Sequence, residues 1–278
     1  MRLLRWPWLV TDLDGTLVAR DLAIPERNLI AVRRYREAGG TVIIATGRNE
    51  VSAGRYHAQL ELDTPLILYN GARIVEPDGT RLLDLTLGTS TARACYELVL
   101  PVLPDEVGAV GFVDTVAYAL KPAEALSRYA ARDQLQLLTG PPPDDLTKVM
   151  LIASEPELDR LEPLVAGLLP KSRQVRSERT YLEILPAQAT KGAALLRLTE
   201  LLGIPLTGVA AIGDNPNDLE LIETADLSAV PADGHPELVR IADAVMGPCA
   251  TGAVADLIAL IDLITRTPPL AAPHSPTH

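Results

Sequence analysis

Two aspartates lie close together near the start of the chain, in the stretch Asp12-Leu13-Asp14-Gly15-Thr16, which follows a short apolar run. Side chains two positions apart on an extended chain point the same way, so Asp12 and Asp14 are expected to face one volume at the end of a strand. Open α/β sheets hold their ligands at that edge, and two carboxylates there suit a hard cation such as Mg²⁺. Gly15 allows a sharp turn that brings main-chain N–H groups near a bound group, and Thr16 adds a hydroxyl. The alternative is an acidic turn that only closes a strand, because Asp-Gly is an ordinary turn signal.

A second acidic stretch, Gly213-Asp214-Asn215-Pro216-Asn217-Asp218, follows the apolar run Val209–Ile212. We therefore expect two further carboxylates at the same edge of the sheet. The alternative interpretation makes Asp214 or Asn215 the N-cap of the following helix, which is chemically sound. With the first acidic pair already at that edge, the pattern favours metal ligation.

Lys191 directly follows Thr190, which has the side chain of a helix N-cap. A cation at that place meets the positive end of the helix dipole and is mildly unfavourable, whereas a bound anion reverses the sign. A helix N-terminus with an added ammonium group is therefore typical of a phosphate site. The alternative is an exposed lysine that costs about a few tenths of a kcal/mol.

Thr46-Gly47-Arg48 follows the β-branched run Thr41–Ala45, which predicts a buried parallel strand. The Thr46 hydroxyl is placed to donate to a phosphoryl oxygen, although Thr-Gly after a strand is often only a turn. Arg48 is open to two interpretations, a contact with the substrate or a salt bridge.

The order of apolar runs predicts the fold class. From the first strand to about Tyr69, strands and helices alternate, which is the pattern of a doubly wound, Rossmann-like parallel sheet, and the alternation resumes near Thr190. Between these parts the strands look paired, which predicts an inserted α+β domain with helices on one face of its sheet. We expect a core domain from residues 1–84 and 187–266, an inserted domain at 85–186 and a disordered tail at 267–278.

Composition narrows the class of partner. The 278 residues carry a formal net charge of −11, which argues against nucleic acid or an anionic membrane as partner because both require basic patches. No apolar run approaches the roughly 20 residues of a membrane helix, and the start lacks a signal-peptide core, so a cytoplasmic protein is expected. Cys95 and Cys249 lack the spacing of metal ligands, and the four histidines form no cluster. The sequence therefore argues against a zinc site. A small molecule is therefore the expected partner.

Taken in order, the stretches at residues 12–16, 46–48, 191–192 and 213–218 resemble the four motifs of the haloacid dehalogenase superfamily of phosphatases. Asn70-Gly71-Ala72, residues 181–186 and the inserted segment further resemble its Cof-like branch with the type IIB cap, so the likeness covers residues 8–264. The chain departs from that branch at Ala187, where Gly is usual, and in the loop 231–236. Arg240 lies near the position of a lysine that is common in the branch.

The resemblance implies a role for each matching residue. Asp12 would be the nucleophile and Asp14 the general acid and base, with Mg²⁺ held by Asp12, the backbone carbonyl of Asp14, Asp214 and Asp218, the last as ligand or just behind the ligands. Thr46 and Lys191 would stabilise the charge on the transferring oxygens. The further residues expected at the phosphate or substrate are Gly15, Gly47, Arg48, Asn70 and Asn217. The cap would exclude water and select the leaving group.

We therefore expect a Mg²⁺-dependent phosphatase that hydrolyses a small phosphorylated metabolite, a sugar phosphate or a related phosphomonoester, through an aspartyl-phosphate. A phosphomutase of the phosphomannomutase type shares these motifs and is the first alternative. The second alternative is a non-catalytic protein that binds a phosphometabolite, although a pure binder does not need both a nucleophile and an acid.

Overall fold

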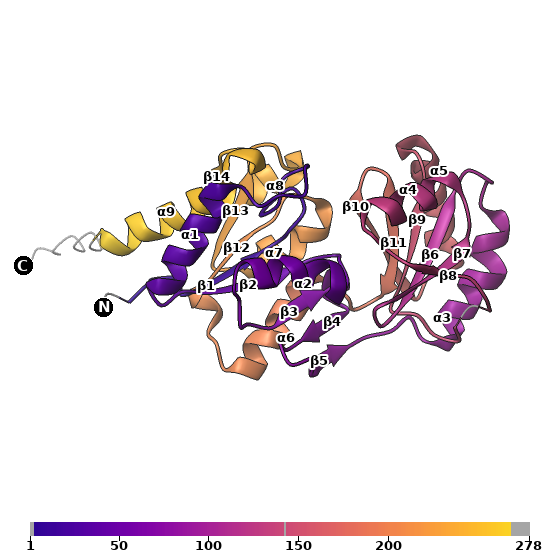
Figure 1. Ribbon diagram of the computed structural model, residues 1–278, viewed down its shortest axis with the longest axis horizontal. Helices are drawn as coiled ribbons and strands as arrows, with labels where there is room; N and C mark the ends of the chain where they lie inside the picture. Colours follow the sequence, from indigo (N-terminus) through magenta and orange to yellow (C-terminus); the bar gives the residue numbers. More distant parts are fainter. Residues whose placement is uncertain (1–2, 142, 268–278) are drawn as a thin grey trace, which may run out of the picture.

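The computed structural model describes residues 3–141 and 143–267. It contains two sheets, each with its own helices, which lie side by side (Figure 1). Residues 268–278, nearly all of the segment expected to be a disordered tail, lie outside the described residues. Within the described part of the chain, no helix is both long and apolar enough to cross a membrane.

The first sheet has eight strands in the order β14-β13-β12-β1-β2-β3-β4-β5, and β1 (Trp8–Thr11) lies well inside it. β1 pairs in parallel with β12 (Val209–Ile212) on one side and β2 (Thr41–Ala45) on the other. The other strands are the parallel β3 (Leu66–Leu68), β13 (Leu227–Pro231) and β14 (Ala244–Met246) and the antiparallel edge strands β4 (Arg73–Val75) and β5 (Arg81–Asp84).

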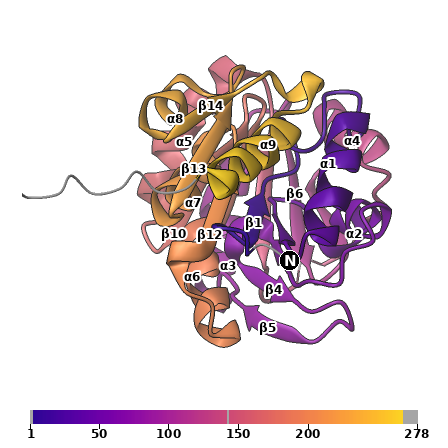
Figure 2. The ribbon, with the colours of Figure 1, turned by 90° about the vertical axis from the view of Figure 1, so that its left-hand side faces the viewer.

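Helices cover both faces of this sheet, because successive residues of its strands point to opposite sides. Leu9 packs toward the face of α1 (Glu26–Glu37), α2 (Glu50–Gln59) and α9 (Ala253–Arg266), whereas Val10 packs toward α6 (Lys191–Leu202) and α7 (Leu219–Thr224). Figure 2 shows the two groups of helices on opposite sides, with α8 (Pro236–Ile241) beside α7. The doubly wound core predicted from the sequence is confirmed.

The second sheet has six strands in the order β10-β11-β9-β6-β7-β8 and is mostly antiparallel. Its helices are α3 (Thr89–Ala94), which continues into one π-helical turn, α4 (Glu124–Arg132) and α5 (Glu155–Leu168). The strands are β6 (Gly108–Val113), β7 (Val116–Lys121), β8 (Leu137–Leu138), β9 (Lys148–Ile152), β10 (Ser172–Glu178) and β11 (Tyr181–Pro186).

The expectation that helices cover only one face of the second sheet is wrong. α3 and α5 pack against the face that carries Ala109 and Leu151. Leu126 of α4 instead packs with Val110 and Phe112 on the opposite face, the one that contributes side chains to the candidate site. The apolar pattern of a short helix does not reveal which face of a sheet it covers, so the sequence could not assign α4.

Two crossings of the chain join the sheets, one after β5 and one after β11. Because these strands end at Asp84 and Pro186, we propose a core domain of residues 1–84 and 187–266 and an inserted cap domain of residues 85–186. The sequence interpretation overlooked β8 and β14, which have two and three residues and are too short to show an alternating pattern.

Candidate active site

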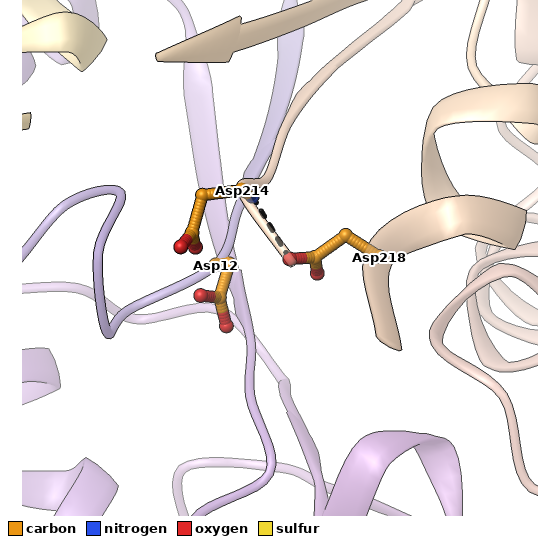
Figure 3. A group of neighbouring side chains, drawn as sticks. All are labelled: Asp12, Asp214 and Asp218. Carbon is orange, nitrogen blue, oxygen red and sulfur yellow. Dashed lines mark hydrogen bonds between the residues drawn. The ribbon is translucent and has the colours of Figure 1, made fainter. Parts of the chain in front are cut away.

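Three aspartates converge at the carboxyl ends of β1 and β12 (Figure 3). Asp12 directly follows β1, Asp214 follows β12 after one glycine, and Asp218 ends the short 3₁₀ turn Pro216–Asp218. One carboxylate oxygen from each lies within 4.8 Å of those of the other two, and all three residues are buried. The parallel pairing of β1 with β12 thus brings the two acidic stretches to one edge of the sheet.

Local backbone geometry holds Asp214 in place. Gly15 has a φ of 84°, and a Cβ at this position would lie 2.3 Å from Asp214 Oδ2, so no other residue fits here without displacing that carboxylate. The Thr16 hydroxyl, predicted as a contact for a bound group, donates to Asp214 Oδ1 at 2.9 Å. Gly15 and Thr16 therefore support a candidate metal ligand from behind.

Asp218 is fixed by the backbone of its own loop. Its Oδ2 accepts hydrogen bonds from the N–H groups of Asp214 at 3.0 Å and Asn215 at 3.2 Å. Asn215 caps the turn that follows, so the helix-cap interpretation of this stretch is correct for Asn215. It applies at the same time as the carboxylate cluster, since Asp214 points into that cluster.

Lys191 is completely buried, so the alternative of an exposed lysine is wrong. Its Nζ donates to Asp12 Oδ1 and to Asp218 Oδ1, each at 2.6 Å. Burial lowers the pKa of this ammonium, but the carboxylates of Asp12 and Asp218 raise the pKa more, and the net shift is upward. Thr190 caps α6 by accepting from the N–H of Ala193 at 2.9 Å. Lys191 is therefore charged and aimed at the acidic cluster from the first turn of its helix.

The cluster contains three carboxyl groups and one ammonium group. Burial raises the pKa of Asp12 to about 7, with Lys191 opposing the shift and Asp218 and Asp14 adding to it. Burial also raises the pKa of Asp214, and the charges of Asp12 and Asp218 raise it further. One ammonium thus faces three carboxylates, and a divalent cation with a preference for oxygen would relieve the excess. The donor set therefore fits Mg²⁺.

Asp14 lines the same cavity as Asp12, but its carboxylate lies outside the cluster that Asp12 forms with Asp214 and Asp218. Arg48 donates to it twice, from Nε at 2.7 Å and from Nη2 at 2.6 Å. β1 ends at Thr11, so Asp14 lies in a turn where the two-residue alternation of a strand does not apply. Arg48 thus forms a salt bridge, the second of its two predicted roles.

Thr46 follows β2 and lines the cavity while being 1% exposed. Its hydroxyl oxygen accepts from the N–H of Arg48 at 3.2 Å, which leaves the hydroxyl proton for another acceptor. Gly47 also lines the cavity. A Cβ on Gly47 would lie 3.0 Å from Asn70 Nδ2, so the loop passes close to that side chain.

The two asparagines predicted as substrate contacts bond to each other. Asn217 Nδ2 donates to Asn70 Oδ1 at 3.0 Å, and Asn70 Nδ2 donates to Glu183 of the cap at 2.9 Å. Both ends of the Asn70 amide are therefore occupied by protein groups, and Asn70 is absent from the described lining of the cavity, whereas Asn217 is part of it. The expectation that Asn70 contacts the substrate stays a prediction, and the contacts in the structure are those of Asn70 with Asn217 and Glu183.

Sequence reasoning missed the cap wall of the cavity. Several of its residues lie at alternate positions of one strand, such as Lys148 and Met150 on β9, and this alternation is the signal that could have revealed them. The cap residues that line the cavity are Phe112, Tyr129, Arg132, Asp133, Lys148, Met150, Ser177, Glu178, Tyr181 and Glu183.

Arg132 contacts four other residues of this wall. Its guanidinium lies over the ring of Tyr129 at 5.9 Å and of Tyr181 at 5.3 Å, and it pairs with Asp133 at 2.8 Å and Glu178 at 3.4 Å. Burial raises the pKa of Glu178, and Arg132 opposes that shift. The wall therefore offers aromatic faces together with hydrogen-bond acceptors.

Comparison with known proteins agrees with this geometry. Residues 9–258 match the family model of haloacid dehalogenase-like hydrolases. An HMP-PP phosphatase of Cronobacter sakazakii is 31% identical over 254 residues, covering 88% of this chain and 91% of that protein. The 5-amino-6-(5-phospho-D-ribitylamino)uracil phosphatase YitU of Bacillus subtilis is 25% identical over 248 residues, covering 85% and 91%.

The fold is also similar to that of a HAD/COF-like hydrolase from Plasmodium vivax, with a TM-score of 0.82, 20% identity and coverage of 94% of this chain and 97% of that one. The match of the family model over most of the chain, together with the named activities of the two relatives, decides the classification. The chain belongs to the haloacid dehalogenase-like hydrolases and is a phosphatase that acts on phosphoric monoesters.

Proposed function

We propose that this phosphatase depends on Mg²⁺, uses Asp12 as its nucleophile and hydrolyses a small phosphorylated metabolite, a sugar phosphate or a related phosphomonoester. The observation that carries the proposal is the buried ammonium of Lys191, 2.6 Å from oxygens of both Asp12 and Asp218. A cation fixed against the nucleophile is placed to meet the charge of a phosphoryl group, which is the main task in phosphoryl transfer.

The proposed reaction has two displacements on phosphorus. Lys191 occupies Oδ1 of Asp12, so the other oxygen attacks, the bond from phosphorus to the ester oxygen breaks, and an aspartyl-phosphate forms. The departing oxygen takes a proton from Asp14. A water molecule then attacks the same phosphorus, its proton passes to Asp14, and inorganic phosphate leaves with Asp12 restored.

Asp12 and Asp214 would hold the Mg²⁺, with Asp218 as a further ligand or directly behind them, and the backbone carbonyl of Asp14 would complete the protein ligands as the family resemblance implies. Bound there, the ion would supply positive charge beside the phosphoryl oxygens. Lys191 and the Thr46 hydroxyl would stabilise the remaining charge on those oxygens.

Asp14 is proposed as the acid although Arg48 now occupies both of its oxygens. Asp14 must therefore leave at least one of these bonds before it can donate a proton to the leaving oxygen. The arrival of the substrate between the two domains is the proposed trigger.

The cap wall supports a polar leaving group with an apolar face. Tyr129 and Tyr181 offer ring surfaces, while Ser177, Asp133 and Glu178 offer partners for hydroxyl groups. The relative YitU is named for a substrate with a phosphorylated ribityl chain on a uracil ring, which has both features. A sugar or polyol phosphate fits the same description.

A panel of phosphorylated metabolites, assayed for inorganic phosphate with Mg²⁺, tests the proposal. We expect the highest kcat/KM among sugar and polyol phosphates, with turnover abolished in Asp12→Asn, whose amide keeps the volume and loses the nucleophile. Transfer of the phosphoryl group to a second sugar hydroxyl without release of phosphate would identify a phosphomutase. Binding of these compounds without turnover would contradict both activities.

A further inference from the structure

Four polar side chains form a network of hydrogen bonds that runs from the cap into the active site. This polar network consists of Lys148, Glu183, Asn70 and Asn217. Lys148 at the start of β9 pairs with Glu183 of β11, with 3.1 Å between Nζ and Oε2. Asn70 Nδ2 donates to the same oxygen at 2.9 Å, and Asn217 Nδ2 donates to Asn70 Oδ1 at 3.0 Å. Asn217 immediately precedes Asp218, so the polar network ends beside the acidic cluster.

Burial makes the ion pair of this polar network costly unless both charged groups have further hydrogen-bond partners. Lys148 and Glu183 are each 3% exposed and Asn70 is 2% exposed. Lys148 Nζ also donates to the carbonyl of Gly47 at 2.8 Å, and the second oxygen of Glu183 accepts from Ser177 at 2.7 Å. A buried ion pair with these extra hydrogen bonds is tolerated, whereas loss of one partner leaves an uncompensated charge. The cap and the core supply the bonds together.

Asn70 is the residue of the polar network that contacts the catalytic loops. Its backbone is left-handed, with a φ of 54°, and its N–H donates to the carbonyl of Thr46 at 2.9 Å. A Cβ on the next residue, Gly71, would lie 2.1 Å from the carbonyl oxygen of Thr190, which precedes Lys191. Asn70 therefore lies against the loop after β2 and close to the start of α6.

We propose that Lys148 and Glu183 are positioning residues, which fix Asn70 when the cap lies on the core and thereby hold Asn217 and the Thr46–Gly47 loop at the phosphoryl-transfer centre. This inference rests on the proposed function, because it takes that centre to lie at Asp12. Its consequence is that turnover depends on these two cap residues even for a substrate whose leaving group does not reach the cap.

A second ion pair between cap and core provides a matched control. Arg173 of β10 pairs with Glu220 of α7, and their side chains are 33% and 28% exposed. Neither residue belongs to the polar network around Asn70. Arg173→Met therefore removes a contact between the domains without changing any residue of the polar network.

The central comparison is between Glu183→Ala, which removes the acceptor of Asn70, and Glu183→Gln, whose amide oxygen still accepts from Asn70. Lys148→Met is the third variant. For each one, kcat and KM are measured with Mg²⁺ on acetyl phosphate, whose leaving group is only an acetate, and on the best substrate of the panel. The melting temperature is measured alongside.

We expect Glu183→Ala and Lys148→Met to lower kcat by about ten- to hundredfold on both substrates, which is the rate equivalent of one lost buried hydrogen bond. KM should change by less than about threefold, since the ground-state contacts of the substrate remain. Glu183→Gln should keep kcat within about fivefold of wild type, and Arg173→Met within about twofold.

Asn70→Gly tests the same link from the core side and serves if Glu183→Ala does not fold. Glycine adopts the left-handed backbone of residue 70 and lacks the amide. It should lower kcat as much as Glu183→Ala does. The double variant should lose little more than either single one, because both remove one shared interaction.

Two outcomes would overturn the inference. Loss of turnover on the larger substrate alone would mean that Lys148 and Glu183 contact the leaving group. A lower melting temperature with unchanged kcat would mean that the polar network only stabilises the fold. Absence of turnover by the wild-type protein on every substrate would instead overturn the proposed function itself.

Discussion

Arg48 holds Asp14 through two parallel hydrogen bonds, from Nε to Oδ2 at 2.7 Å and from Nη2 to Oδ1 at 2.6 Å. Burial lowers the pKa of this guanidinium, but its bonds to Asp14 raise the pKa by more, so Arg48 stays charged. Only a guanidinium offers this forked geometry to a carboxylate. Arg48 therefore decides where the proposed general acid lies before the substrate arrives.

Arg48→Lys should slow the hydrolysis of an alkyl phosphate by about tenfold and that of p-nitrophenyl phosphate by less than about threefold. An alkoxide requires a proton from a well-placed Asp14, whereas p-nitrophenolate leaves without one. The measurement is kcat/KM on both substrates, with Asp14→Asn as a control that should show the same selectivity more strongly. Equal losses on both would mean that Arg48 binds the phosphoryl group itself.

Lys191→Met should lower kcat by roughly two to three orders of magnitude, because the transferring oxygens lose a fixed cation. The free energy of unfolding without Mg²⁺ should also fall, by about 3 kcal/mol at neutral pH, since two buried carboxylates lose their counterion. Denaturant titrations with and without Mg²⁺ check this, and the ion should restore part of the loss. A variant with normal turnover would show that the phosphate site lies elsewhere.

The metal-free protein should lose stability as the pH rises toward 8. Burial raises the pKa of Asp12 to about 7 and raises that of Asp214, so the folded protein binds more protons than the unfolded chain between about pH 4 and 7. The stabilisation is complete below the unfolded value and is lost as the pH passes the folded one. Mg²⁺ should therefore raise Tm more at pH 8 than at pH 5, which thermal melts in buffered chelator or Mg²⁺ measure. An equal gain at both pH values would contradict the metal site.

Gly15→Ala should damage the metal site, and Gly79→Ala provides the control. Both glycines have a left-handed backbone, with φ of 84° and 89°, so each alanine costs about 1–2 kcal/mol of backbone strain. Only at residue 15 does the new Cβ meet Asp214, whereas nothing lies within 4 Å of it at residue 79. We expect Gly15→Ala alone to require more Mg²⁺ for half-maximal activity. Equal Mg²⁺ requirements would show that Asp214 adapts freely.

The meeting of Asp12, Asp214 and Lys191 could be predicted because each residue follows a regular element at a fixed place. Parallel strands end at one edge of a sheet, so apolar runs followed by aspartates are enough to place two carboxylates together. The helix cap Thr190 similarly placed Lys191 in the first turn of α6. Local patterns in the sequence determine these positions.

The partners of Asp14 and Asn70 could not be predicted in the same way. Asp14 lies in a turn, where the direction of a side chain follows from neighbours rather than from a period. Asn70 bonds to Glu183, which lies on a different domain, so the contact depends on how the cap rests on the core. The face covered by α4 depends on the same docking. No local pattern encodes the relative placement of two domains.

The pairing of β1 with β12 has a consequence for the order in which the protein folds. Trp8 pairs with Val209, so the centre of the core sheet joins residues that leave the ribosome far apart in time, with the whole cap synthesised between them. The strands of the cap, in contrast, close within one continuous segment. Contacts between distant residues form slowly, so amide protons of the cap sheet should gain protection from hydrogen exchange before those of β1 during refolding. The catalytic edge is then assembled after the cap sheet, and the nascent chain carries no completed nucleophile site until residues 209–218 have been made.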